Sequence, residues 1–169
     1  GYGGVIGGHA FLAIAPQNPQ TIGSIPGVDT NRNFTLSGFT HGRDLYKEAG
    51  VNLTSNADYA YAYGPYSNTV GRVVVAPPAG MSQEEFERQV VASYNSLPGT
   101  ITATEYGALG QNRLSGNPNS NNVASSLLFT SGVSGAQVNS YQSQLYAQNN
   151  RFTPGLGQPA ITPVQNVGS

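Results

Sequence analysis

The chain has 169 residues, of which 38% are apolar and only 9% are charged, and its formal net charge is −1. A chain of this length can form one domain with a sizeable core. A net charge so close to zero provides no basic surface for nucleic acid or for an acidic membrane, so we expect neither partner. The absence of cysteine excludes a disulfide framework, a thiolate metal site and a cysteine nucleophile.

The chain shows no internal repeat and no linker, so we expect a single domain over residues 1–169. Residues 1–7 are rich in glycine and predict a flexible lead-in, which opens as though cut from a longer protein. Residues 153–169 carry several prolines and predict an extended tail. No apolar run reaches the roughly 18 residues of a membrane-spanning helix, and no signal peptide is recognised.

The first half of the chain predicts strands separated by irregular segments. Residues 9–15 form an apolar run that ends at a proline, which is typical of a buried strand. Residues 16–31 contain many glycines and prolines and predict a loop. Residues 33–39 alternate apolar and polar side chains, as a half-buried strand does. Residues 41–56 predict irregular structure, with one helical turn near residues 45–49.

Two further strands are predicted before the first long helix. Residues 57–63 alternate alanine with tyrosines at positions 59, 61 and 63, which predicts a strand with the tyrosines on one face. That face would serve cross-strand packing or, alternatively, recognition of an aromatic ligand or a carbohydrate. Residues 69–76 hold four valines and predict a central strand that ends at Pro77.

The second half of the chain predicts helices. Ser82 with Glu85 three residues later is a capping box, which marks the start of a helix. This helix is expected to bury residues at helical spacing: Phe86, Val90, Tyr94 and Leu97. Residues 100–106 predict a short strand, and residues 136–148 predict a weaker helix. Strands followed by helices in this order predict an α+β domain with a mainly antiparallel sheet.

The stretch Asn117–Val123 predicts the start of another buried helix. A proline at position 118 ends the preceding segment, and Asn119 or Ser120 suits the N-cap position. An apolar stripe follows at helical spacing, made of Val123, Ala124, Leu127 and Leu128. Gly132 is a plausible stop for this helix.

Ser120 would then lie in the first helical turn, where free N–H groups and the helix dipole favour a developing oxyanion. The same position suits a serine that only caps the helix. A serine nucleophile needs a base at neutral pH, and the chain holds two histidines, His9 and His41. His9 begins the first predicted strand, where it either closes the strand beside a glycine turn or faces the start of the Ser120 helix.

His41, Asp44 and Glu48 have the donor types of a metal site, but their spacing matches no recognised one. We interpret His41, Arg43 and Asp44 as a solvated loop instead. The sequence therefore predicts no structural metal and no cofactor.

Three segments resemble, in order, parts of the domains at the C-terminal ends of Rhs-type and related polymorphic toxins: 8–19, 77–82 and 117–128. More remotely, the arrangement is similar to the circularly permuted papain-like superfamily, which includes NlpC-related and lecithin:retinol acyltransferase-like proteins. In that superfamily a histidine strand comes first and an Asn-Cys motif opens a later helix. The resemblance covers roughly residues 7–132 and implies a permuted papain-like fold.

The resemblance implies Ser120 as nucleophile and His9 as base. The position of Ser120 usually holds cysteine, and a serine alcohol depends more on its base because its pKa is far higher than that of a thiol. Oxyanion support would come from the neighbouring asparagines: Asn119, Asn121 and Asn122. The polar residue that orients the histidine would be one of Thr35, Ser37 and His41.

The function implied is that of a secreted or delivered toxin effector that hydrolyses or transfers at an amide or ester. Its substrate would be a peptidoglycan stem peptide, a protein or a lipid. Expected partners are a parent delivery protein and a cognate immunity protein. Two alternatives stay open: a catalytically inactive binding module that uses the asparagine-rich turn and the tyrosines, and a structural cargo domain inside a delivery shell.

Overall fold

The computed structural model describes residues 10–41, 44–65, 67, 71–101 and 120–149. Its sheet holds four antiparallel strands in the order β1-β2-β3-β4: β1 (Leu12–Ile14), β2 (Phe34–His41), β3 (Asp44–Gly50) and β4 (Thr100–Ile101). Its helices are α1 (Ala57–Tyr63), α2 (Gln83–Ser96), α4 (Ser120–Phe129) and α5 (Gly135–Asn149). The predicted α+β class with an antiparallel sheet is confirmed.

The sheet is built around the hairpin of β2 and β3, which pair from Thr35 with Gly50 to His41 with Asp44. The prediction of an irregular segment with a helical turn near residues 45–49 was wrong, because this segment is most of β3. The sequence of β3 is polar and gives a weak strand signal. Pairing with β2 decides its conformation by satisfying its backbone groups along one edge.

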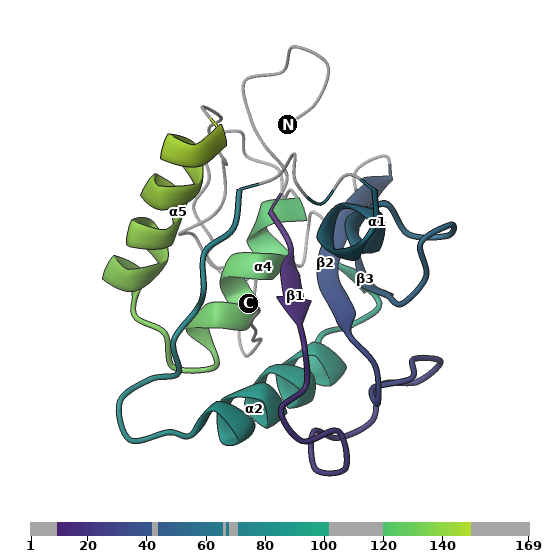
Figure 1. Ribbon diagram of the computed structural model, residues 1–169, viewed down its shortest axis with the longest axis horizontal. Helices are drawn as coiled ribbons and strands as arrows, with labels where there is room; N and C mark the ends of the chain where they lie inside the picture. Colours follow the sequence, from purple (N-terminus) through teal and green to yellow (C-terminus); the bar gives the residue numbers. More distant parts are fainter. Residues whose placement is uncertain (1–9, 42–43, 66, 68–70, 102–119, 150–169) are drawn as a thin grey trace.

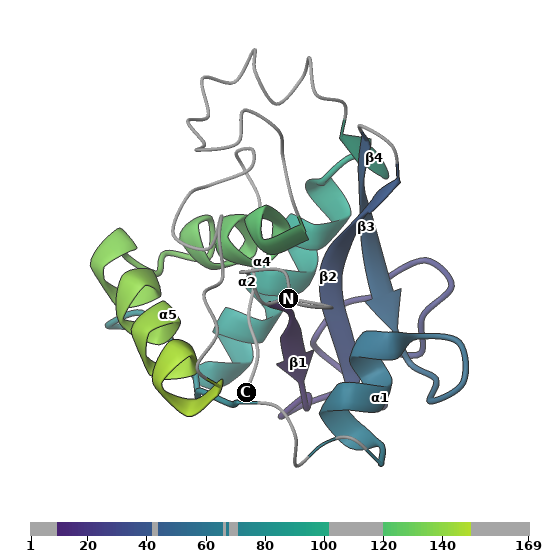
Figure 2. The same cartoon turned by 90° about the horizontal axis from the view of Figure 1, so that it is seen from above.

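The domain has three layers, with α1 on one face of the sheet and α2 and α4 on the other (Figures 1 and 2). Two glycines on the strands define the faces. A Cβ atom at Gly38 of β2 would lie 2.5 Å from Val123 Cγ2 of α4. A Cβ atom at Gly50 of β3 would lie 2.4 Å from Asn56 Oδ1, beside α1. Because side chains alternate along a strand, the same strands supply both interfaces.

The first long helix, α2, begins as predicted. The Ser82 hydroxyl accepts a hydrogen bond from the Glu85 backbone N–H at 3.0 Å. At the other end, Lys47 of β3 donates from Nζ to the Tyr94 carbonyl at 2.8 Å, and the ammonium lies 4.6 Å from the centre of the Tyr94 ring. Burial lowers the pKa of Lys47 and raises that of Tyr94. The hydrogen bond and the cation–π contact of Lys47 thus hold the carboxyl end of α2 against the sheet.

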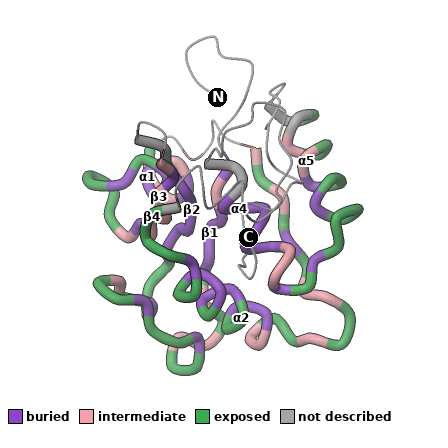
Figure 3. The backbone as a smooth tube through the Cα atoms, turned by 180° about the vertical axis from the view of Figure 1, so that it is seen from behind, coloured by how far each residue is buried: buried purple, intermediate pink, exposed green. Residues whose placement is uncertain are grey.

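Helix α4 begins at Ser120 as predicted and is buried from Val123 to Leu128 (Figure 3). Gly132 ends it with a positive φ of 96°. The N–H of Val133 donates to the Leu128 carbonyl at 3.0 Å, and that of Gly132 to the Phe129 carbonyl at 3.0 Å. This is a Schellman motif, and it confirms Gly132 as the stop.

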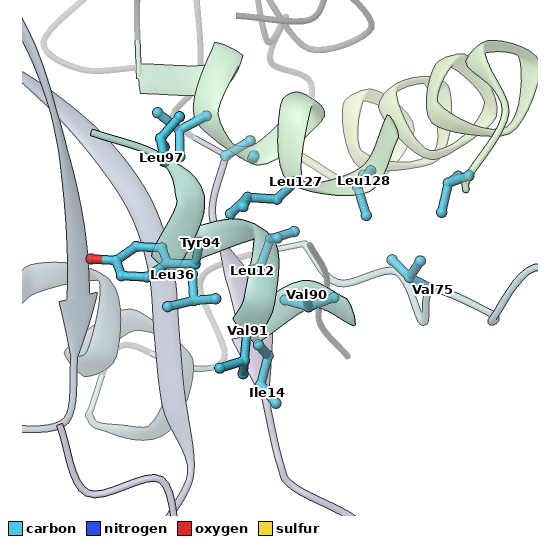
Figure 4. Packing of buried hydrophobic residues seen from close by; sticks show 14 of the residues in the cluster. Leu12, Ile14, Leu36, Val75, Val90, Val91, Tyr94, Leu97, Leu127 and Leu128 are labelled. Atoms are coloured by element: carbon cyan, nitrogen blue, oxygen red, sulfur yellow. The ribbon is translucent and has the colours of Figure 1, made fainter. Parts of the chain in front are cut away.

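The core lies between the sheet and the α2–α4 layer (Figure 4). Strands β1 and β2, helices α2 and α4 and one extended segment all contribute to it. Figure 4 labels ten of its members: Leu12, Ile14, Leu36, Val75, Val90, Val91, Tyr94, Leu97, Leu127 and Leu128. The apolar residues predicted to be buried in α2 and α4 are all in this core.

The prediction of a strand over residues 57–63 was wrong, because these residues form α1. The Asn56 side chain caps the helix by accepting from the Tyr59 N–H at 2.8 Å. At the last turn the Arg72 guanidinium donates to the Ala62 carbonyl. The alternation of alanine and tyrosine suggested a strand, but the Asn56 cap and the high helix propensity of alanine favour a helix here.

The prediction of a central strand over residues 69–76 was also wrong for its described part, because residues 71–76 pair with no strand there. Val75 is buried in the core, whereas Val74 is 78% exposed. The Ala76 N–H donates to the Tyr141 hydroxyl of α5 at 3.2 Å. Exposed and less exposed side chains alternate along residues 71–76, as they do along a strand. The hydrogen-bond partner at Ala76, however, is a side chain of α5 rather than a neighbouring strand.

The two shorter predictions of the second half are confirmed within the described residues. The strand predicted over residues 100–106 is represented by β4, whose other predicted residues lie outside the described part. The weaker helix is α5, which begins after Ser134, whose hydroxyl accepts from the Gln137 N–H at 3.1 Å. No helix in the described ranges is long and apolar enough to cross a membrane.

Candidate functional site

The predicted catalytic position lies at the first turn of α4. Ser120 is the first residue of this helix, and Asn121 and Asn122 follow it in the same turn. For these three residues, the structure describes the path of the backbone. His9 and Asn119 lie outside the described residues, as do the predicted lead-in and tail.

The start of α4 is fixed by its contact with β2. Val123, one turn after Ser120, contacts the bare backbone of Gly38, where any side chain would collide with it. Leu12 of β1 pairs with Leu36 of β2 in antiparallel register, so residues before Leu12 run in the direction of Gly38. Ala10, the first described residue, is buried and belongs to the same core. Figure 1 shows the beginning of β1 beside the N-terminal end of α4.

The candidates for an orienting residue lie on β2. Thr35 and Ser37 are buried, and neither hydroxyl has a hydrogen-bond partner. Thr35 is paired with Gly50, and a Cβ atom on Gly50 would lie 2.6 Å from Thr35 Oγ1, on the α1 face. Alternation places Ser37 on that face too, so the sheet separates both hydroxyls from α4. His41 is the last residue of β2 and pairs with Asp44.

The described residues contain no group of three or more histidine, aspartate or glutamate side chains that could hold a metal ion. The predicted solvated loop of His41, Arg43 and Asp44 was wrong for its described residues, because His41 ends β2 and Asp44 begins β3. Glu48 lies on β3 too. Because Asp44 and Glu48 are separated by an even number of positions, they extend from the same face of the strand, well apart along it.

A second region was missed by sequence reasoning. A pocket of about 380 Å³ lies where the loop before β2, the turn after β3 and α1 meet. It is lined by Arg32, Val51, Asn52, Leu53, Thr54, Tyr59 and Tyr63. Tyr59 and Tyr63 are four positions apart, so on a helix they share one face, and their ring centres are 5.0 Å apart. The sequence signal that could have revealed this pocket is Asn56, a helix-capping residue directly before residues 57–63, because a helix there places Tyr59 and Tyr63 on one face.

Fold and site together define a three-layer α+β domain with a buried helix whose first turn begins at a serine. Comparison of the chain with protein-family models, with curated proteins and with solved structures finds no match.

Proposed function

We propose that this protein is a hydrolase or acyltransferase in which Ser120 is the nucleophile and His9 the general base. The observation that carries this proposal is the meeting of β1, β2 and the start of α4 at Gly38 and Val123. The strand that follows His9 in the sequence and the helix that opens with Ser120 thereby meet at one part of the sheet. The permuted papain-like arrangement requires such a meeting.

In this reaction the Ser120 hydroxyl oxygen attacks the carbonyl carbon of an amide or ester while its proton passes to the His9 imidazole. The tetrahedral intermediate expels the amine or alcohol, which takes that proton, and leaves an acyl-enzyme. Water or an acceptor then releases the acyl group by the same steps in reverse. The first N–H groups of a helix have no partner within the helix, so those of the first turn of α4 suit the oxyanion, with Asn119, Asn121 and Asn122 as further donors.

The orienting residue in this proposal is one of Thr35, Ser37 and His41, all on β2. They stand an even number of positions apart on one strand, so the strand gives all three the same face, and the sheet alone does not rank them. A third residue of this kind would hold the His9 ring in the tautomer that accepts the serine proton.

The biological role proposed is that of a toxin effector delivered by a larger parent protein and neutralised by a cognate immunity protein. The resemblance of three ordered segments to polymorphic-toxin domains supports this role. Peptidoglycan stem peptides, proteins and lipids are the substrate classes, all of which contain amide or ester bonds.

The test is expression of the full chain in bacteria, with growth as the measurement, for the parent and for Ser120→Ala, His9→Ala and Ser120→Cys. Both alanine variants should lose toxicity to the same extent, because nucleophile and base act as a unit. Ser120→Cys should retain it, because the related sites are built for sulfur. Ser134→Ala is the matched control, since it removes a capping serine from α5 at a cost of about 1 kcal/mol.

Toxicity that persists in both Ser120→Ala and His9→Ala, with the folded state confirmed by circular dichroism, would overturn the proposal and favour a binding module. Thr35→Val, Ser37→Ala and His41→Ala test the orienting residue. We expect one of these variants to lose toxicity while the other two keep it, and full toxicity in all three would contradict an orienting residue on β2.

A further inference from the structure

The pocket beside α1 is made by three segments that are held in place independently of any ligand. The Asn52 side-chain oxygen accepts from the Thr54 N–H at 2.8 Å and from the Thr54 hydroxyl at 2.7 Å, which fixes the turn after β3. The Asn56 cap fixes the start of α1, and packing of the Tyr59 ring on Tyr63 fixes its inner face. The walls are therefore formed in advance, as in most small-molecule sites.

Arg32 is the charged residue among those that line the pocket. It is exposed, its backbone N–H donates to the Asp29 carbonyl, and among the described residues no ion pair involves its guanidinium. No aspartate or glutamate is among the lining residues. The electrostatic character of the pocket therefore favours an anion.

Most of the remaining lining is apolar or aromatic, and Asn52 and Thr54 are its polar members. Leu53 is 50% exposed, which makes it one of the three large hydrophobic side chains exposed in the described structure. The side chains of Val51, Tyr59 and Tyr63 continue this surface into the pocket. A bound apolar group would remove this surface from water, at a gain of roughly 25 cal/mol per Å².

We propose that this pocket binds a small aryl carboxylate. The carboxylate pairs with the Arg32 guanidinium, whose two parallel N–H groups match the two oxygens of a carboxylate. The aromatic ring lies against Leu53 and the tyrosine rings, where aromatic pairs add to the gain from burial. Both requirements, an anion and a planar apolar body, are satisfied by one molecule of this class.

The pocket is separate from the α4 start. It lies on the α1 side of the sheet, near the pairing of Thr35 with Gly50, whereas Val123 meets Gly38 on the opposite face. The inference therefore does not depend on Ser120 or His9, and each proposal can fail without the other.

The test is a titration of the full chain with 2-naphthoate, followed by ¹H–¹⁵N NMR, with the neutral isostere 2-naphthamide as the matched ligand. We expect shifts concentrated at residues 51–54 and 59–63, and tighter binding of the acid than of the amide. Arg32→Gln should weaken binding of the acid at least tenfold and leave the amide unchanged. Arg88→Gln removes an exposed arginine on α2 and should change neither affinity.

Leu53→Ser should weaken binding of both ligands, because it removes apolar contact without changing charge. The proposal is overturned if 2-naphthoate shifts residues scattered over the surface, if the amide binds as tightly as the acid, or if Arg32→Gln binds the acid like the parent.

Discussion

The two faces of the sheet are packed by the same strands in opposite ways. On the α4 face, side chains interlock so closely that Gly38 has no room for a Cβ atom beside Val123. On the α1 face, Thr35 and Ser37 are buried with unpaired hydroxyls, and an open pocket lies at the edge of the helix. One face is thus a close-packed core, and the other keeps polar groups and space.

This difference indicates that the two faces contribute unequally to the stability of the fold. Close packing makes the α4 face sensitive to every methyl group, and it also fixes the start of α4 relative to the strands. The α1 face contributes less to stability, because a seven-residue helix covers it and buried hydroxyls there lack partners. We therefore expect substitutions on the two faces to differ in cost.

The largest contrast is expected between two leucines. Leu127 of α4 is fully buried, so Leu127→Ala should lower the free energy of unfolding by about 2–5 kcal/mol. Leu53 is half exposed on the α1 side, so Leu53→Ala should change it by less than about 0.5 kcal/mol. Urea denaturation measures both, and similar costs for the two would contradict the difference between the faces.

A glycine pair tests the close approach. Gly38→Ala places a Cβ atom 2.5 Å from Val123 Cγ2 and should cost about 1–3 kcal/mol. Val123→Ala in the same chain should recover part of that loss. Gly99→Ala is the control, since its Cβ atom meets no atom within 4 Å. If Gly38→Ala unfolds at the same urea concentration as Gly99→Ala, α4 is not packed on β2 as described.

The cap of α1 should have a smaller effect. Asn56→Ala removes the side-chain oxygen that accepts from the Tyr59 N–H and should cost about 1 kcal/mol. The loss should concentrate in α1, so amide hydrogen exchange in residues 57–63 should accelerate more than in α4. Uniform acceleration in both helices would show that α1 does not open separately.

At neutral pH, the smallest effect is expected at Tyr63. Burial raises the pKa of Tyr63 to about 12 from an ordinary value of 10. The folded state thus favours the protonated phenol, and this contribution is complete below pH 10 and lost as the pH rises to 12. Tyr63→Phe should match the parent near pH 7, because the hydroxyl has no partner, and should lose less stability between pH 10 and 12. Parallel pH profiles for the two chains would refute this assignment.

Much of the α4 side was predictable from local pattern. The cap at Ser82, the apolar stripe from Val123 to Leu128 and the stop at Gly132 follow from short-range rules, and the structure confirms each of them. The first strands were also predicted, because runs of apolar residues and regular alternation are strong signals. The catalytic roles of Ser120 and His9 remain a prediction from resemblance.

The failures share one cause. Residues 57–63 alternate in the sequence and residues 71–76 are rich in valine, whereas residues 45–49 give a weak strand signal. Of these three segments, only residues 45–49 are paired as a strand in the described structure, as part of β3. Alternation records which side chains face inward but not the partner of the backbone. Asn56 supplied that partner for α1, Tyr141 supplied one for residue 76, and β2 supplied it for β3.

The sequence by itself determined the α+β class, the helix boundaries that caps and glycine fix, and the residues of the α2–α4 core. These depend on interactions between residues a few positions apart, which the order of the chain displays directly. Only the tertiary structure decided which face of β2 meets α4, why Thr35 and Ser37 lie across the sheet from it, and that Arg32 and Tyr63 line one pocket. These depend on contacts between segments far apart in the chain, where pairing and close packing override local preference.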